Sequence, residues 1–290
     1  MDLLQLVLNG IALGAAYALV ALGFVLVLNA TGAVNFAQGD LVMAGGFVAV
    51  ALAQTVPAPG ILLLPLVLLG MAMLGLIFSA LAYFPLMRRP PVTVFISTIA
   101  MGIVLQNAAN AIFGAEPRAT PALLGDRLYR LGGLVIGEQS LAIIGVAAAL
   151  VLAQHLLFTR TQLGRSLRAT AQDRDMARAI GIPVARMIAL TFALASALAG
   201  AAGLLLAHQY FVEPTRGTEL IVSAYIAVVI GGWGSLPGAV LGALLVALFE
   251  VIASAYVSYT AATALLYIAL LALLWLRPQG LLGEPFRRRV

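Results

Sequence analysis

Long runs of apolar residues dominate this chain, and short polar stretches separate them. Crossing a hydrocarbon core of about 30 Å takes about 20 helical residues. The runs are continuous rather than alternating, so they indicate helices and not the strands of a membrane barrel. The clearest runs cover residues 3–28, 61–86, 92–113, 141–158, 187–207 and 261–276. A shorter run covers 41–56, and an interrupted one covers 220–252.

The composition agrees with a chain that lies mostly inside a membrane. Hydrophobic residues make up 63% of the sequence and charged residues 9%, and the mean hydropathy is +1.08. A soluble domain carries about 25% charged residues. We therefore expect an all-α polytopic membrane protein, folded as one domain over residues 1–290, with about eight transmembrane helices, some broken or re-entrant.

Arginine supplies all of the side-chain positive charge, because the chain has no lysine. The arginines concentrate at Arg88 and Arg89, within residues 160–186, and at 287–289. Short arginine-rich loops stay in the cytoplasm, which places residues 114–140 on the outer side. This sorting explains the net charge of +5 without a nucleic-acid partner. A Walker A loop needs lysine, so no standard ATP site is expected on this chain.

Two segments break the apolar runs, one in each half of the chain. The first is "LNATGAVNFAQGDLVMAGG" (28–46), which places Asn29, Asn35 and Gln38 between apolar stretches. The second is "VIGGWGSLPGAVLGALL" (229–245). In hydrocarbon, irregular backbone is tolerated only where protein buries it or where it lines an aqueous cavity. A matched pair of broken segments is a sequence signature of a transport path.

The glycines of the second segment have two readings. Gly231, Gly232 and Gly234 indicate a chain break, because Pro237 follows so closely. Gly238 and Gly242 fit equally well with close helix packing, since small residues four apart let helices approach. We therefore assign the translocation path to two sets of residues. They are Asn29, Asn35 and Gln38 from the first break, and Gly231, Gly232 and Gly234 from the second.

Few side chains suggest chemistry beyond transport. Asp40 is expected at the membrane interface, and Glu250 near a helix end, rather than as ligands, since an isolated buried charge is expensive. His155 and His208 show no metal-ligand spacing, so no metal site is expected. The chain offers no nucleophile beside a base, and an enzyme is not expected.

The arginine-rich loop over 160–186 predicts one short helix outside the membrane, from residue 165 to 180. Gly181 fits the position after the helix end, and Pro183 prevents the helix from continuing. Arginines lie on one side and small residues on another. The residues alone leave two readings open: a helix resting on anionic membrane lipid, or a helix that docks on a cytoplasmic partner.

Four stretches together resemble the LivH-type permease subunits of branched-chain amino acid ABC importers. They are "NGIALGAAYALVALGFVLVLNATGAVNFAQGDLVMAGGFVA", "GRSLRATAQDRDMARAIGI", "VIGGWGSLPGAVLGALL" and "RPQGLLG". They follow one another in the family's order over nearly the whole chain.

The resemblance implies a multi-pass protein of the bacterial inner membrane. Its partners would be a second related permease, two cytoplasmic ATPase subunits that bind the ATP, and a periplasmic substrate-binding protein. No cofactor is expected on this chain itself. The loop would couple to an ATPase through Arg168, Ala171, Asp175, Ala179, Gly181 and Ile182. The implied cargo is a branched-chain or related amino acid. Urea or a short amide is the alternative cargo, and a stand-alone ion-coupled transporter the alternative class.

Overall fold

The computed structural model describes residues 3–56, 58–125, 127–131 and 134–283. Its α-helices are α1 (Leu3–Thr31), α2 (Gln38–Thr55), α3 (Gly60–Phe78), α4 (Pro91–Phe113), α5 (Glu138–Arg160), α6 (Gln162–Gln172), α7 (Arg174–Ala179), α8 (Val184–Tyr210), α9 (Gly217–Gly231), α10 (Leu236–Tyr256) and α11 (Tyr259–Leu276). A π-turn, η1 (Ser79–Tyr83), and a 3-10 turn, η2 (Phe84–Leu86), extend α3.

Seven of the described helices are long and apolar enough to cross a membrane. They are α1, α3 with its extension to Leu86, α4, α5, α8, α10 and α11. The apolar helix α9 is shorter than these seven. Helix α2, which lies between α1 and α3 in the chain, is not among them. The six clearest apolar runs each match one of these spans closely, so the prediction of an all-α polytopic membrane protein is confirmed.

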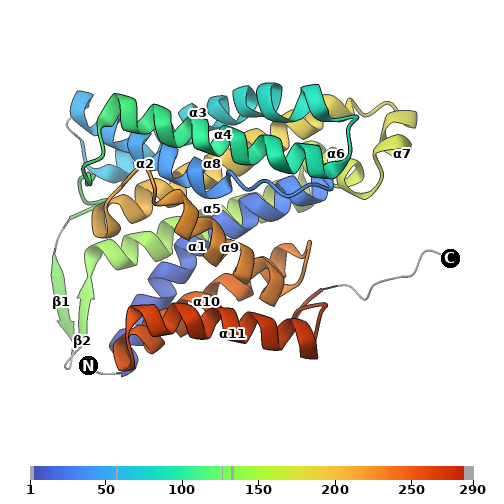
Figure 1. The fold of residues 1–290 in the computed structure, drawn as a ribbon. Helices are drawn as coiled ribbons and strands as arrows, with labels where there is room; N and C mark the ends of the chain where they lie inside the picture. The colour runs from blue at the N-terminus through green and yellow to red at the C-terminus, as the bar shows by residue number, and fades with distance from the viewer. Residues whose placement is uncertain (1–2, 57, 126, 132–133, 284–290) are drawn as a thin grey trace.

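The bundle has two distinct ends, which Figure 1 shows at left and right. The start of α1 lies at the left together with a short hairpin, and we call this the hairpin end. The hairpin pairs β1 (Leu128–Leu131) with β2 (Leu134–Gly137), in antiparallel register. At the right lie α6, α7 and the end of α11, and we call this the α7 end. The predicted cytoplasmic loop is therefore at the opposite end from the predicted outer loop.

The hairpin was not expected from the sequence, which predicted only a loop over 114–140. Its strands contain Tyr129, Val135 and Ile136, residue types that favour strands. The signal is weak because each strand is four residues long.

Helix α1 forms the centre of the bundle, with 89% of its most apolar window buried inside the protein. It packs against α10, α8, α5 and α9. Lipid offers helices no hydrophobic drive to associate, so close van der Waals packing between small residues has to hold them. Gly14 shows this at the α10 contact, where an added Cβ would lie 2.9 Å from Leu244 Cα.

Candidate functional site

The first break is closed by side chains, two from the break itself and one from α4. Helix α1 ends at Thr31, whose hydroxyl donates to the Val27 carbonyl (2.7 Å) and accepts from the Ala33 amide (3.2 Å). Asn35 Oδ1 accepts from the Ala37 amide (3.1 Å) where α2 begins. The Phe36 amide donates to Thr98 Oγ1 on α4 (3.2 Å). Side chains therefore satisfy the backbone groups that the break leaves without helical partners.

The path residues Asn35 and Gln38 lie inside the subunit. Their exposed fractions are 1% and 0%. Asn35 donates to Gln38 Oε1 (3.4 Å), and Gln38 Nε2 donates to the Ala195 carbonyl of α8 (3.3 Å). Both side chains thus hold α2 against its neighbours. Their assignment to a translocation path stays a prediction.

Asp40 lies beside the middle of a candidate membrane span, which differs from the interface position expected from the sequence. Its carboxylate packs beside Gly102, which is the midpoint of α4 and lies about 16 Å along the helix from either end. Gln106 Nε2 donates to Asp40 Oδ1 (2.8 Å). Asp40 is 8% exposed.

Two helix N-termini meet at this buried carboxylate. Asp40 lies in the first turn of α2, and Gly217, the first residue of α9, packs directly against it. Helix N-termini carry partial positive charge and stabilise an anion. Sequence reasoning missed the arrangement because α9 begins far from Asp40 in the chain. We call the set Asp40, Gln106 and Gly217 the mid-depth junction.

The second break is confirmed, since α9 ends at Gly231 and α10 begins at Leu236. A distant segment closes it. The Leu281 amide donates to the Ile230 carbonyl (2.9 Å) and the Leu282 amide to the Gly231 carbonyl (2.8 Å). Gly232 has a φ of +120°, and an added Cβ would collide with the backbone of Gly283. The "RPQGLLG" stretch therefore caps the end of α9, a role that the sequence did not suggest.

The two breaks touch each other at the α7 end. Asn29 Nδ2 of α1 donates to the Gly234 carbonyl (2.9 Å). Gly234 itself has a φ of +82°. Gly238 and Gly242 face the last turns of α9, where an added Cβ would collide with the carbonyl oxygens of Gly231 and Ala227. Of the two readings left open for these two glycines, close packing is the one that holds.

Glu250 lies near the end of α10, as expected, and lines a small cavity there. It is six residues before the end of α10, about 9 Å along the helix. Tyr17 donates its hydroxyl to Glu250 Oε2 (3.2 Å). The cavity measures about 90 Å³, and the ion pair of Arg216 with Glu219 (3.3 Å) lines it as well. This volume has room for several ordered water molecules.

A strip of amides runs along α4 on the surface of the subunit. Asn107 and Asn110 are exposed, and Gln106 is half-buried. With Glu213 and Thr215 they line an open hollow of about 250 Å³. Exposed polar side chains on a spanning helix are costly in lipid and normally face protein or water. We call Gln106, Asn107 and Asn110 the amide strip.

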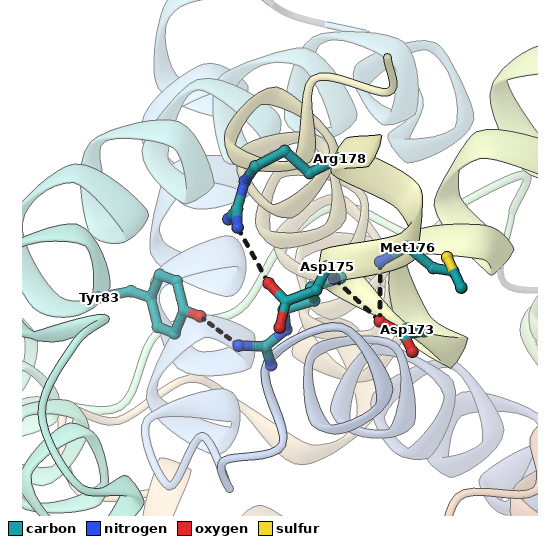
Figure 2. Close-up of polar contacts among 6 residues, drawn as sticks. Tyr83, Asp173, Asp175, Met176 and Arg178 are labelled. Carbon is teal, nitrogen blue, oxygen red and sulfur yellow. Dashed lines mark hydrogen bonds and ion pairs between the residues drawn. The ribbon is translucent and has the colours of Figure 1, made fainter. Parts of the chain in front are cut away.

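The arginine-rich loop forms two helices, so the prediction of one helix over 165–180 is wrong. Helix α6 ends at Gln172 and α7 begins at Arg174. Asp173 between them is extended, and its carboxylate accepts from the amides of Asp175 (2.9 Å) and Met176 (3.0 Å), as Figure 2 shows. Because the Asp173 side chain caps the start of α7, its backbone is extended and α6 cannot continue through it.

Helix α7 ends as the glycine predicted. Gly181 has a φ of +85°. The Ile182 amide donates to the Ala177 carbonyl (3.0 Å) and the Gly181 amide to the Arg178 carbonyl (3.1 Å). This pair of bonds is the Schellman arrangement of a helix C-terminus.

Helix α7 presents apolar side chains to the outside. Met176 is 66% exposed and Ile180 71% exposed, with Ala179 and Gly181 exposed beside them. Asp175 forms an exposed ion pair with Arg178 (3.0 Å). We call Met176, Ala179, Ile180 and Gly181 the α7 knob.

The knob is joined to the membrane helices from its inner side. Arg174 donates to the hydroxyl of Tyr83 (3.4 Å), which is buried in the π-turn at the end of α3 (Figure 2). Nearby, Arg168 and Ala171 of α6 line a cavity of about 210 Å³ together with Asn29 and Leu236. Two residues predicted for coupling and one predicted for the path, Asn29, thus line one cavity. The remaining coupling residues, Asp175 and Ile182, lie in or beside α7.

The chain matches a known protein family over most of its length. Residues 6–275 match the family described as "Branched-chain amino acid transport system / permease component". The chain belongs to this family. It is a multi-pass permease subunit, and the ABC transport permeases that it resembles are not themselves enzymes.

Three curated relatives illustrate the range of the match. The chain is 33% identical to the high-affinity branched-chain amino acid permease protein BraD of Pseudomonas aeruginosa, over 97% of this chain and 96% of the relative. It is 33% identical to LivH of Escherichia coli K12, over the same shares. A more distant relative is the fructose import permease FruF of Bifidobacterium longum, at 26% identity over 81% of this chain and 67% of the relative.

No cluster of histidine, aspartate or glutamate that could hold a metal occurs among the described residues. His208 Nδ1 lies 2.9 Å from the Thr120 carbonyl, where it ties the end of α8 to the outer loop. His155 lies at the α7 end of α5.

Proposed function

We propose that this permease carries a branched-chain or related amino acid across the bacterial inner membrane. It does so within an ABC importer that contains a second related permease, two ATPase subunits and a periplasmic substrate-binding protein. ATP binds to the partner subunits. The family match and the 33% identity to BraD and LivH support this assignment of cargo and partners.

The amide strip is the observation that carries the proposed path. Asn107 and Asn110 are exposed on a helix that crosses the membrane, so they need protein or water opposite them. The strip leads inward to the mid-depth junction, because Gln106 belongs to both. We place the path along this face of α4 and the start of α9, with the second permease opposite.

The chemistry of this face suits a zwitterion. Uncharged amides can donate to the cargo carboxylate and accept from its ammonium group, without a fixed charge that would trap either. Broken helices that begin near mid-depth are typical of transporter substrate sites. Asn29, Asn35, Gln38, Gly231, Gly232 and Gly234 remain our predicted path residues toward the α7 end.

Coupling is proposed to run through the α7 knob. Met176 and Ile180 would enter an apolar groove on an ATPase subunit, and Ala179 and Gly181 leave room for close approach. The Arg174–Tyr83 bond and the shared cavity at Asn29 would carry the motion to the membrane helices.

The test combines uptake and ATPase measurements on the assembled transporter. Ala179→Trp should reduce uptake at least tenfold and uncouple it from ATP hydrolysis, while the subunit is still inserted into the membrane. Ala153→Trp, on an exposed face of α5, is the matched control and should leave uptake unchanged. Normal uptake by Ala179→Trp would remove the knob from the mechanism.

Asn107→Leu tests the path independently of coupling. It should lower uptake with the transporter fully assembled, whereas Asn9→Leu on α1 should not. Competition by excess urea rather than excess leucine would assign the alternative cargo. Gradient-driven uptake by this chain without ATPases would instead point to an ion-coupled transporter.

A further inference from the structure

A long groove runs down the side of the bundle between α5 and α10, with α1 as its floor. It has a volume of about 840 Å³. Both α5 and α10 pack on α1, and the groove between them reaches α1, where Ile11 is exposed, Ala15 is half-buried, and Ala18 and Leu22 are buried at the bottom. Ala15 and Ala18 form part of the floor, and Ala147 and Ala148 part of the α5 wall. Because these side chains are small, the groove is deep enough to admit an object between the helices.

The length of the groove suits one leaflet of a bilayer. Its α10 wall extends from Leu236 to Leu244, about 12 Å, and its floor from Ile11 to Leu22, about 16 Å. The apolar part of its α5 wall extends from Ile144 to Leu152, about 12 Å, and the polar mouth continues to Thr159 over about 10 Å more. Half of a hydrocarbon core of about 30 Å is about 15 Å. The walls are almost entirely apolar along this length.

The groove becomes polar only at the α7 end. Arg168 of α6 and Gln154, His155 and Thr159 of α5 line it there. No carboxylate is among the described residues that line the groove. An apolar slot with a cationic mouth matches an acyl chain that ends in an anionic headgroup.

Gln154 adds a second requirement at the mouth. Its side-chain oxygen is buried and has no hydrogen-bond partner among the described residues. A buried acceptor of this kind needs a donor, and leaving it unmatched is unfavourable. A phosphate alone cannot supply one, but a hydroxyl on the headgroup can.

We propose that this groove binds one phospholipid of the cytoplasmic leaflet, with an anionic, hydroxyl-bearing headgroup of the phosphatidylglycerol type. The acyl chain lies over Ala15 and Ala18, the phosphate contacts Arg168, and a headgroup hydroxyl donates to Gln154 Oε1. A helix of the second permease is the competing occupant. The lipid is favoured because one headgroup carries both a phosphate for the cationic mouth and a hydroxyl for the unmatched acceptor of Gln154.

The test measures lipid binding to the full-length purified chain in detergent. Native mass spectrometry counts retained phosphatidylglycerol and phosphatidylcholine, and thermal unfolding reports stabilisation by each. The wild-type chain should prefer phosphatidylglycerol. Arg168→Gln should lower the affinity for phosphatidylglycerol about fivefold, as expected for one interfacial arginine, and leave that for phosphatidylcholine unchanged.

Two matched controls isolate the groove. Arg165→Gln changes an exposed arginine on the same helix outside the groove, and should keep the preference. Ala148→Trp fills the groove and should abolish retention of both lipids, whereas Ala149→Trp, the next exposed residue, should not. Ala148→Leu serves the same purpose if the tryptophan variant fails to fold.

Several results would overturn the proposal. Equal loss of preference in Arg165→Gln and Arg168→Gln would show only diffuse attraction to anionic lipid. Equal retention by the Ala148 and Ala149 variants would place the lipid elsewhere. If Ala148→Trp instead blocked association with the second permease and left lipid retention unchanged, the groove would be a protein interface.

Discussion

The two breaks differ in what satisfies the backbone groups that each interruption leaves without helical partners. At the first, between α1 and α2, side chains near the break satisfy the freed backbone groups, with Thr31 and Asn35 in the segment itself and Thr98 on α4. At the second, between α9 and α10, glycines admit a backbone segment from the end of the chain, and its amides satisfy the carbonyls of Ile230 and Gly231.

The difference follows from what each sequence can offer. The first break has hydroxyl and amide side chains of the right length, so it can be closed without close backbone contact. The second has glycines at 231 and 232, which leave room for another backbone but carry no side chain that could donate to the carbonyls of Ile230 and Gly231. We therefore expect the first break to be sensitive to single polar side chains, and the second to bulk and to the distant segment.

The largest effect is expected for Gly232→Ala. The new Cβ collides with the backbone of Gly283, and the φ of +120° is unfavourable for alanine. Strain and collision together should destabilise the fold by about 3 kcal/mol or more, seen as a fall of several degrees in thermal unfolding. Gly114→Ala is the control, because Gly114 has a φ of +82° but nothing within 4 Å of an added Cβ. Equal losses in the two variants would show that strain alone matters.

A truncation after residue 278 should act on the second break alone. It removes the donors to Ile230 and Gly231, and each buried carbonyl left unmatched is worth about 1–3 kcal/mol. The natural chain has no cysteine, so single cysteines report local opening cleanly. Labelling of Trp233→Cys by a maleimide should speed up on truncation. Labelling of Val34→Cys in the first break should stay unchanged, and faster labelling there would mean that the two breaks open together.

A smaller and local effect is expected for Thr98→Val. The substitution keeps the shape but removes the acceptor of the Phe36 amide, at about 1–3 kcal/mol of stability. Thr191→Val is the matched control, since Thr191 is also buried but only donates to the Met187 carbonyl in its own helix. If both variants unfold at the same temperature, the first break does not depend on that contact.

Particular elements show how far the sequence could be read. The apolar runs located the spans closely, because an unbroken stretch of about 20 apolar residues has few alternatives to a membrane helix. Gly181 predicted the end of α7 for the same kind of local reason, since a glycine that is followed two residues later by Pro183 is typical of a helix C-terminus. The division of the loop at Asp173 was missed, because an aspartate inside a helical pattern can either continue the helix or cap a new one, and the local sequence does not distinguish the two.

The candidate site was predicted only in part. The quoted segments identified both breaks, and the structure adds that Asn29 contacts Gly234 across them. Asp40 was placed at the interface because a lone acid in an apolar chain is expensive when buried. Its partners, Gln106 and the start of α9, come from far along the chain, and no local pattern connects them.

The sequence by itself determined the class of protein, the spans, the breaks and the arginine-rich loop, since each depends on hydrophobicity or on backbone chemistry over a few neighbouring residues. Only the tertiary structure decided what fills the gaps between these parts. Residues 281 and 282 cap α9, two helix starts meet at Asp40, and α5 and α10 leave a groove on α1. The physical reason is that a buried polar group needs a partner in space, and sequence separation does not limit where that partner comes from.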